Sequence, residues 1–467
     1  MIDSIIGALP SGTVLTDPEA IAPYLVDWRG MFRGSAECVV RPRTVEEVAT
    51  VIRLARSHGM AIVPQGGNTG LAGGATPLPG RSQIVLSLNR MNAVRSIDRA
   101  GMTMAAEAGC IVEAAKNSAL QQGRQLPIGF AAEGSATIGG MVSTNAGGIN
   151  ALRYGTARQL VLGLEAVLAD GTILHGMRNL RKDVAGYDWK QLLIGSEGTL
   201  GIVTAAMLKL ATVPSKRTGA FVAVGSATAA LGLLEHVQDT LGDCVSAFEL
   251  MSDASVQRVV LHLGGRVPMG ASPWYVLLEV ADNSSDLNDR LEACLDTAVE
   301  HGIVQDAAIS ASLSQLAEFW KLREGMGEAE RLAGRSVKHD VSVGVSDVPE
   351  FLEAAVRAVA AVASDLDVNA FGHVGDGNIH FNVLGSQRPE TDKEINAAVH
   401  AVVQQFRGSI SAEHGIGQYR VKELAASKSE SEHALMRRLK LALDPECILN
   451  PGKVLPLVIR SGHMALI

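Results

Sequence analysis

The stretch PQGGNTGLAGG, residues 64–74, places five glycines within eleven residues, directly after a short apolar segment. Glycine lets the main chain come close to an anion, and successive N–H groups can form a cradle for phosphate. The loop lacks the Gly-Lys-Ser/Thr of a Walker sequence, and prolines follow too soon for a helix that opens on a GxGxxG fingerprint. Taken alone, it is equally compatible with an ordinary glycine-rich turn.

Two further passages have the same character, GFAAEGSATIGGMVSTNAGG at 129–148 and GSEGTLGIVT at 195–204. The longer one carries small and hydroxyl side chains with hardly any charge. Such a segment suits a long, flat cofactor that lies against the main chain. Three loops of this kind in one region predict a nucleotide-cofactor site in the first half of the chain.

The chain is long enough for two domains, because its 467 residues exceed what one hydrophobic core usually supports. Strand and helix patterns alternate from residue 36 to about 213, and all three glycine-rich passages fall in this part. After Val213 the glycine-rich character fades, and new strand and helix patterns predict a second α+β unit. The expected fold class is therefore α+β.

Local signals predict individual elements. Residues 44–59 have the pattern of an amphipathic helix in which Thr44 and Glu47 form a capping box. Residues 161–174 predict a hairpin that turns at Asp170-Gly171. A helix is expected near 312–333 and a strand at 336–343.

FGHVGDGNIHFNV, residues 371–383, is the most informative stretch of the second half. Its Asp376-Gly377 predicts a type I′ hairpin that would pair His373 with His380. Directly opposed side chains have Cβ atoms about 4.5–5.5 Å apart, which suits two imidazoles that bind one metal ion. Histidines in the core without any metal are the alternative.

SAEHGIG, residues 411–417, holds two more candidates. Glu413 could supply a carboxylate as third metal ligand and leave a coordination position open for a substrate. His414 would then be a free base beside the metal. The sequence does not show that this loop meets the hairpin.

The composition describes a globular protein, with 47% hydrophobic and 19% charged residues. A formal net charge of −8 without a basic stripe argues against nucleic-acid binding. Five scattered cysteines without CxxC spacing predict reduced thiols in a cytosolic chain. We expect no secretory signal and no transmembrane segment.

Together these motifs resemble a known family. PQGGNTG, IGG…TNAGG, RYG at 153–155, GYD at 186–188 and GSEGTLGI are similar to the FAD domain of the vanillyl-alcohol-oxidase/PCMH superfamily. FGHVGDGNIHFNV, SAEHGIG and LNPGK at 449–453 narrow the resemblance to the FAD-linked D-2-hydroxyacid dehydrogenases, which include D-lactate, glycolate-oxidase-subunit and D-2-hydroxyglutarate dehydrogenases.

The resemblance extends from about residue 36 to 457 and implies an architecture. A lead-in at 1–35 precedes a PCMH-type FAD-binding domain at 36–213. An α+β substrate or cap domain with an antiparallel sheet and the metal site follows at 214–420. Residues 421–467 are a C-terminal helical segment that returns to the FAD domain.

In this family the first loop and the 129–148 segment hold the FAD pyrophosphate, largely through main-chain groups. Non-covalent FAD is implied, because the first loop has no histidine to carry a covalent flavin. The residues assigned to FAD are Pro64, Gln65, Gly66, Gly67, Asn68, Thr69, Gly70, Leu71, Gly134, Ser135, Thr137, Ile138, Gly139, Gly140, Thr144, Asn145, Ala146, Gly148, Glu197, Gly198, Gly201, Ile202 and Asn450.

The resemblance also assigns the reacting groups. His373, His380 and Glu413 are the implied ligands of a divalent metal, with zinc expected, and the two histidines thereby face the substrate. His414 is the implied base. Asn382 is expected to help orient the substrate.

Cationic residues are expected to bind the substrate carboxylate. Arg323 stands on an apolar helical stripe, where an arginine usually has an anionic partner. A structural ion pair would explain that spacing equally well, but the WxLRE context of the family favours a carboxylate-binding role. Lys338 matches the lysine expected near the distal end of the substrate.

Gly327, four residues after Arg323, departs from the family pattern. D-2-hydroxyglutarate dehydrogenases often carry a hydroxyl residue there, and glycine offers no side-chain hydrogen bond to a second carboxylate. A preference for a dicarboxylate therefore stays open beside D-lactate or a bulkier D-2-hydroxy acid.

The implied reaction oxidises a D-2-hydroxy acid to the 2-keto acid, with hydride transfer to flavin N5 and electrons passed to a quinone or an electron-transfer flavoprotein. A flavin-containing subunit of a glycolate-oxidase-like complex, a metal hydrolase without flavin and an O₂-using oxidase are the alternatives. We expect a cytoplasmic location. Peripheral association with the inner membrane and a homodimer are left open.

Overall fold

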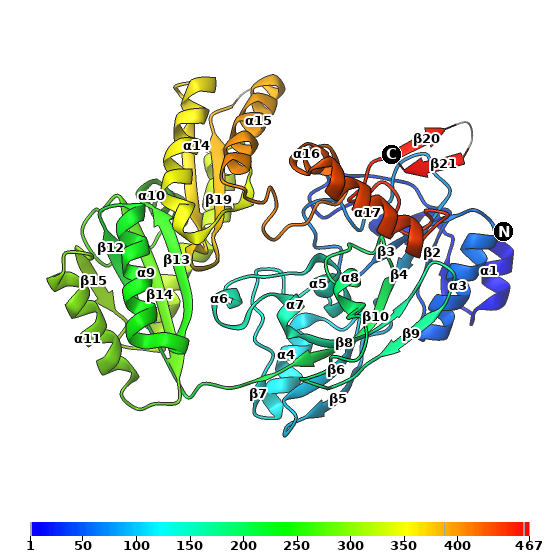
Figure 1. The fold of residues 1–467 in the computed structure, drawn as a ribbon, viewed down its shortest axis with the longest axis horizontal. Coiled ribbons are helices and arrows are strands. Elements are labelled where there is room, and N and C mark those ends of the chain that lie inside the picture. Colours follow the sequence, from blue (N-terminus) through cyan, green and yellow to red (C-terminus); the bar gives the residue numbers. More distant parts are fainter. Residues whose placement is uncertain (1, 387, 461–462, 467) are drawn as a thin grey trace. The chain divides into compact units, whose positions relative to one another are not determined.

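The computed structural model describes residues 2–386, 388–460 and 463–466 (Figure 1). The chain divides into two compact units. Unit 1 comprises Met1–Gly148, Tyr154–Val213 and Glu413–Ile467, and unit 2 comprises Ile149–Arg153 and Pro214–Ala412. The chain thus leaves unit 1 after Val213 and comes back to it at Glu413.

A four-stranded sheet in unit 1 carries the first glycine loop (Figure 1). Its order is β1-β2-β4-β3, with β2, β4 and β3 parallel and β1 antiparallel to β2. The strands are β1 (Val14–Leu15), β2 (Cys38–Val40), β3 (Ala61–Gln65) and β4 (Gln83–Ser87). Because β3 ends at Gln65, the glycine loop begins at the carboxyl end of a parallel strand.

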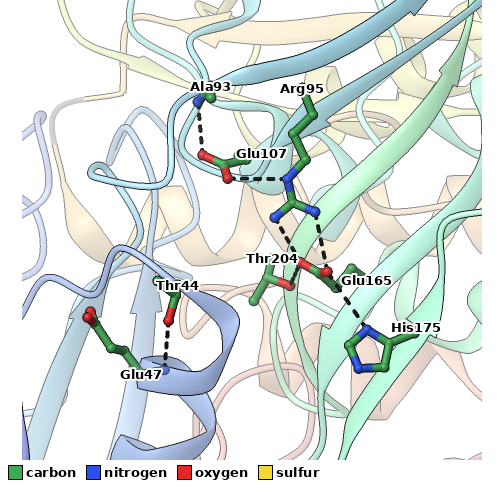
Figure 2. Close-up of polar contacts among 8 residues, drawn as sticks. All are labelled: Thr44, Glu47, Ala93, Arg95, Glu107, Glu165, His175 and Thr204. Carbon is green, nitrogen blue, oxygen red and sulfur yellow. Dashed lines mark hydrogen bonds and ion pairs between the residues drawn. The ribbon is translucent and has the colours of Figure 1, made fainter.

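Helix α3 (Val45–Ser57) begins as the sequence predicts. The Thr44 hydroxyl accepts a hydrogen bond from the Glu47 main-chain N–H at 3.2 Å (Figure 2). The reciprocal hydrogen bond of the predicted capping box is not formed as expected. The Glu47 carboxylate accepts from the main-chain N–H of Arg43 instead of the N–H of Thr44. The buried face of α3 packs in one core with Ile62, Ile84 and neighbouring residues of the parallel strands.

A five-stranded antiparallel sheet in the order β5-β6-β10-β8-β9 forms the second layer of unit 1. Its strands are β5 (Val94–Asp98), β6 (Thr103–Glu107), β8 (Val161–Val167), β9 (Ile173–Gly176) and β10 (Ile202–Lys209). The predicted hairpin is confirmed, since Val167 pairs with Ile173 and Gly171 takes a φ of +82° at the turn.

A row of polar side chains crosses this sheet with one residue from each strand (Figure 2). The Arg95 guanidinium donates to Glu107 at 3.2 Å and to both carboxylate oxygens of Glu165 at 3.0 and 3.3 Å. Thr204 donates to Glu165 at 2.9 Å, and His175 lies 4.0 Å from it. The carboxylate of Glu165 is almost buried, so Arg95 supplies the charge that burial requires.

Short elements complete unit 1. They are α1 (Ile2–Ala8), α2 (Pro18–Ile21), η1 (Ala22–Tyr24), α4 (Val112–Gln121), β7 (Arg124–Gln125), α5 (Ile138–Thr144), α7 (Ala157–Leu160), α8 (Lys190–Leu193), β11 (Ala211–Thr212), α16 (Val421–Ser427), α17 (Glu430–Leu443), β20 (Leu457–Arg460) and β21 (His463–Leu466). Helix α6 (Ala151–Tyr154) lies where the chain crosses between the units.

The C-terminal segment joins the parallel sheet. Ile62 of β3 donates its N–H to the carbonyl of Ile448, and its own carbonyl accepts from Asn450, both at 2.7 Å. Residues 448–450 therefore run beside β3 in the manner of an added parallel strand. The strand that leads into the glycine loop is therefore paired with a segment from near the C-terminus.

Unit 2 is built on a seven-strand path, β15-β12-β14-β13-β18-β19-β16, with β17 also pairing β19 (Figure 1). All its pairs are antiparallel. The strands are β12 (Lys216–Val224), β13 (Val245–Ser252), β14 (Trp274–Asp282), β15 (Asp306–Ile309), β16 (Ser336–Val337), β17 (Asp340–Ser342), β18 (Asp367–Gly372) and β19 (Asn378–Leu384).

Helices cover this sheet. On one face, α10, α12 and α13 enclose a core with Phe221, Met251 and Tyr275, while α9 and α11 pack on the other. The helices are α9 (Ala227–Leu241), α10 (Asp253–Leu263), α11 (Leu287–Glu300), α12 (Leu313–Glu324), α13 (Met326–Ala333), α14 (Val348–Val362) and α15 (Pro389–Gln405), with the short turns η2 (Gly242–Cys244), η3 (Val345–Asp347) and η4 (Val374–Asp376).

Three predictions for unit 2 are corrected. The helix expected near 312–333 is broken at Gly325 into α12 and α13, and the strand expected at 336–343 is two short strands. The type I′ hairpin is wrong, because Asp376 belongs to the turn η4 and only Gly377 has a positive φ. A type I′ turn needs positive φ at both residues. His380 consequently pairs with Phe371, not with His373.

Candidate active site

A cavity of about 300 Å³ in unit 1 is lined by all three glycine-rich passages. Its walls are mainly main chain and small side chains, which is the surface that a flat nucleotide cofactor needs. Glu413 and His414, the first residues after the chain comes back from unit 2, line the same cavity.

The glycines of the first loop permit close approach between two protein segments. A Cβ added to Gly66 would lie 2.2 Å from the Thr137 hydroxyl, and one added to Gly67 would lie 1.9 Å from the Ser135 carbonyl oxygen. Any side chain at either position would push the first loop away from residues 135–137. These two glycines therefore set the width of the cradle.

The second wall is the start of helix α5. Thr137 is its N-cap, and its hydroxyl accepts from the Gly140 N–H at 3.4 Å. The helix carries no charged side chain in its sequence IGGMVST. A Cβ on Gly139 would meet Ala108 at 2.7 Å, so this glycine lets α5 lie against the strand-to-helix connection after β6.

Glu197, on the third passage, holds the segment that follows His414. Its two carboxylate oxygens accept the N–H groups of Ile416 and Gly417, each at 2.7 Å. Burial raises the pKa of Glu197, and these two hydrogen bonds act in the opposite direction. The carboxylate is thus a clamp between residues far apart in the sequence.

Asn450 and Lys453 reinforce this clamp. The Asn450 amide donates to the carbonyls of Gly74 and Glu197 at 2.9 and 2.8 Å. Lys453 donates to the Thr76 carbonyl at 2.7 Å, and burial lowers its pKa to about 7 although Glu197 acts to raise it. The C-terminal segment therefore fixes both the first and the third glycine-rich passage.

The residues expected to contact FAD fall into two groups. Those that line the cavity are Pro64, Gln65, Gly66, Gly67, Asn68, Thr69, Gly70, Leu71, Thr137, Gly139, Gly140, Thr144, Ala146, Glu197, Gly198 and Ile202. Those outside its lining are Gly134, Ser135, Ile138, Asn145, Gly148, Gly201 and Asn450. The sequence interpretation missed the apolar wall formed by residues such as Leu88, Phe130 and Met141, whose types give no cofactor signal.

In unit 2, the expected polar residues gather on one face of the sheet. Phe371 pairs with His380 and Asn369 pairs with Asn382 across β18 and β19, so these side chains share a face. Asp340 of β17 pairs with His380 from the other side. The rings of His373 and His380 have centroids 6.3 Å apart, although the two residues are not register partners.

Glu249 of β13 lies among these groups and is almost fully buried. Its Oε2 accepts from the Nε of Arg323 at 2.7 Å, and its Oε1 lies 3.2 Å from Nδ1 of His373. Burial acts to raise the pKa of Glu249, but the electrostatic interactions with His373 and Arg323 and the hydrogen bond from Arg323 outweigh it and lower the pKa. Arg323 thus forms the structural ion pair that its spacing allowed, with a glutamate that the sequence analysis did not name.

A second buried glutamate, Glu330 of α13, holds two other candidates. Its carboxylate accepts from the Asn382 amide at 2.7 Å and lies 3.1 Å from the Lys338 ammonium. Asn369 and Ser336 also donate to it. Burial acts to raise its pKa, but Lys338 and the three hydrogen bonds lower it overall. The cation of Lys338 stays partly exposed above this network.

A signal for Glu249 is present in the sequence, because it stands in VSAFELMS, an apolar strand in which an acidic residue needs a partner once buried. Its cationic partner Arg323 comes from the distant helix α12, so the sequence pattern does not show which cation pairs with it.

Gly327 lies on α13 with open space around it. A Cβ there would meet no atom within 4 Å. The absence of a hydroxyl side chain at this position therefore leaves room beside the helix.

The segment before Glu413 belongs to the sheet of unit 2. Ser409 and Ser342 exchange two main-chain hydrogen bonds, and the Ala412 N–H donates to the Asp340 carbonyl at 3.0 Å. Ala412 therefore lies beside the strand residue that pairs with His380. Glu413 is the next residue along the chain.

Solved structures show the fold class. Alkyldihydroxyacetonephosphate synthase matches with a TM-score of 0.74 and 18% identity over 96% of this chain and 84% of that one. A substrate-bound p-cresol methylhydroxylase matches with a TM-score of 0.73 and 17% identity over 97% and 96%. The expected α+β, PCMH-type fold is confirmed.

Family and sequence comparisons narrow the class. Residues 36–176 match the family described as FAD binding domain, and 213–454 match FAD linked oxidases, C-terminal domain. D-2-hydroxyglutarate dehydrogenase of Bos taurus, a mitochondrial protein, is 40% identical over 95% of this chain and 81% of that protein. The enzyme of the same name from Xanthomonas citri pv. viticola is 38% identical over 96% and 95%.

The chain therefore belongs to the FAD-linked D-2-hydroxyacid dehydrogenase family and is an FAD-dependent enzyme of this kind. Among the residues that the structure describes, none of the helices has the length and apolar character needed to cross a membrane.

Proposed function

We propose that this dehydrogenase oxidises D-2-hydroxyglutarate or a related D-2-hydroxy acid, such as D-lactate, with the help of a divalent metal, expected to be zinc. The observation that carries the proposal is the shared sheet face in unit 2. Two imidazoles, His373 and His380, lie there beside Arg323, a buried cation already oriented by a carboxylate. Metal ligands and an anchor for a carboxylate are the two groups that a metal-bound 2-hydroxy acid requires.

His373, His380 and Glu413 are the proposed metal ligands. Two histidines and one carboxylate form a donor set that suits zinc and leaves a position for the substrate. Support for Glu413 is its covalent link to Ala412, which is hydrogen-bonded beside the strand partner of His380. The donor chemistry therefore fits the implied metal.

FAD is assigned to the cavity of unit 1, with the sixteen expected residues that line it as its contacts. When bound, FAD accepts a hydride at N5 and the metal stabilises negative charge on the substrate oxygen. His414, which lines this cavity, takes the hydroxyl proton as general base. Arg323 binds the substrate carboxylate and so orients the carbon that loses hydride.

The identity of the acid rests on Lys338, Asn382 and Gly327. The relatives' name, D-2-hydroxyglutarate dehydrogenase, favours a dicarboxylate. Lys338 supplies a second, partly exposed cation for a distal carboxylate, and Asn382 shares its glutamate partner. Gly327 offers no side-chain hydrogen bond to a second carboxylate, so D-lactate and bulkier D-2-hydroxy acids are the alternative substrates. A quinone or an electron-transfer flavoprotein is the proposed electron acceptor.

Anaerobic flavin reduction tests the proposal. The purified holoenzyme is mixed with D- and L-forms of 2-hydroxyglutarate, lactate and a longer 2-hydroxy acid, and flavin absorbance is followed. We expect bleaching by D-acids alone, fastest with D-2-hydroxyglutarate.

The variant His414→Ala should keep FAD and metal but slow the reduction by about 10²–10⁴-fold. His262→Ala, at an exposed position on α10, is the control. Bleaching by L-acids, or a His414→Ala rate within twofold of wild type, contradicts the assignment.

A further inference from the structure

We infer that Glu249 is a positioning residue that couples the metal ligand His373 to the substrate anchor Arg323. The inference rests on the proposed function and deepens it, because it assigns to one buried carboxylate the joint orientation of both groups. All three residues lie in unit 2.

The first contact fixes Arg323. Glu249 accepts the Nε–H of Arg323 at 2.7 Å. The guanidinium lies over the Phe371 ring, with Cζ 4.9 Å from its centroid. Because the pair uses Nε, the edge formed by the two terminal nitrogens is left for a bidentate bond to a second carboxylate. Glu249 and Phe371 together set the plane in which that carboxylate must lie.

The second contact addresses His373. Oε1 of Glu249 and Nδ1 of His373 are 3.2 Å apart, and both are buried atoms without a hydrogen-bond partner among the described residues. Two unsatisfied polar atoms that face each other at this distance need only a small rotation of the ring to form a hydrogen bond. A proton held on Nδ1 leaves Nε2 as the lone-pair donor for a metal.

One carboxylate thereby serves two partners. A buried glutamate is costly unless it is paired. Oε2 of Glu249 is paired with Arg323, and its Oε1 lies 3.2 Å from Nδ1 of His373. Carboxylates that bind the outer nitrogen of a metal-ligating histidine orient the ring, and their loss typically weakens metal binding about 10–100-fold. Removing Glu249 should therefore affect metal affinity and substrate affinity together.

Glu279 of the neighbouring strand provides a matched control. It is likewise buried and ion-paired, accepting from Arg217 at 2.7 Å and from the Trp320 indole at 2.8 Å. Its carboxylate accepts hydrogen bonds from Arg217, Ser246 and Trp320 of the described residues, and not from Arg323. Glu279→Gln removes the same charge from the same sheet without touching the proposed coupling.

Zinc affinity is the decisive measurement. Metal-free, FAD-loaded wild type, Glu249→Gln and Glu279→Gln are titrated with Zn²⁺ against a chromophoric chelator. We expect Glu249→Gln to bind zinc about 10–100-fold more weakly and Glu279→Gln to stay within twofold of wild type. The dissociation constant of a 2-keto acid, read from the flavin spectrum, should rise for Glu249→Gln alone.

A second variant provides the test if Glu249→Gln alone does not fold. The double variant Glu249→Gln/Arg323→Met leaves no unpaired buried cation, and its zinc affinity should still fall about 10–100-fold. If that affinity is unchanged in a variant that folds, Glu249 does not position His373 and the inference is overturned. The proposed function then stands, provided that wild type binds zinc and reduces its flavin with D-acids. Wild type that binds no zinc overturns the proposed metal site itself, and the inference with it.

Discussion

The cavity of unit 1 and the polar sheet face of unit 2 are built in opposite ways. The cavity is walled by glycines, small side chains and main-chain groups, and glycines such as Gly67 are needed because another backbone segment passes within reach. The sheet face is made of charged side chains, in which Glu249 and Glu330 each hold a cation and at least one further polar group.

This difference has a functional meaning. A flat cofactor that stays bound can be recognised by shape and main-chain polarity, which tolerate little change in backbone position. A substrate and a metal are recognised by charge and ligand geometry, which depend on individual side chains and their partners. Each region should therefore fail in its own way, and flavin content and metal content measured on the same sample report the two failures separately.

The largest difference between metal content and flavin content is expected for His380→Ala. Loss of a proposed metal ligand should remove the bound metal and lower turnover by about 10³-fold, since metal stabilisation of a developing oxyanion contributes several kcal/mol. Flavin absorbance should be unchanged. His301→Ala, at the end of α11 in the same unit, is the control. Elemental analysis that finds full metal content in His380→Ala removes this residue from the ligand set.

Arg323→Lys tests the charged face without removing charge. Lysine lacks the planar fork and the Nε donor that Glu249 accepts, so KM should rise and kcat fall, with kcat/KM lower by about 10–100-fold. Flavin content should not change. The exposed Arg331→Lys serves as control. Unaltered kinetics together with a lower unfolding temperature would make Arg323 purely structural.

Gly67→Ala should have the opposite effect, with loss of flavin and retention of metal. Its Cβ would lie 1.9 Å from the Ser135 carbonyl oxygen, so the cradle must open, at a cost of about 1–3 kcal/mol in the free energy of unfolding. FAD should be lost on gel filtration while metal content is kept. Gly7→Ala in helix α1, where a Cβ meets nothing within 4 Å, should retain FAD. Equal flavin retention in both variants would refute the close-approach explanation.

The smallest effect on activity is expected from Lys453→Met, which should instead change the pH dependence of stability. Because the pKa of Lys453 is lowered from 10.5 to about 7, the unfolded chain binds a proton that the folded chain lacks between these pH values. The free energy of unfolding contributed by this lysine therefore rises with pH across that window and is lowest below pH 7. The rise in Tm between pH 6.5 and 9 should be smaller for Lys453→Met than for wild type. The difference should be about 2–4 °C for each kcal/mol that this lysine contributes to the free energy of unfolding.

The exposed Lys428→Met is the control for this pH dependence. Its Tm should follow pH as in wild type. A parallel Tm profile for Lys453→Met and wild type would show that Lys453 titrates normally in the folded protein.

Local signals predicted much of the fold. The cap at Thr44 and the hairpin at Asp170-Gly171 were correct, because hydrogen bonds within a few residues decide them. The hairpin near Asp376-Gly377 was wrong, because the same dipeptide can close a longer connection. There Gly377 lies against the Val343 carbonyl, a tertiary contact that no local pattern contains.

The sequence named candidate residues for the site but not their partners. The sequence named His373, His380, Arg323 and Lys338, and unit 2 brings them to one polar region of its sheet. Their acidic partners come from β13 and α13, at sequence distances that no spacing rule covers. The roles assigned to these residues stay predictions until the variants are measured.

The clamp of Glu197 on Ile416 and Gly417 has a consequence for how the protein is made. Most of unit 2, Pro214–Ala412, comes before the last segment of unit 1 in the sequence. A nascent chain that ends at Val213 therefore lacks Ile416 and Gly417, the residues whose N–H groups donate to Glu197. That segment leaves the ribosome only after the whole of unit 2 has been translated. We therefore expect FAD to bind late in biogenesis, and truncated chains that end before Gly417 to lack the absorbance of bound flavin.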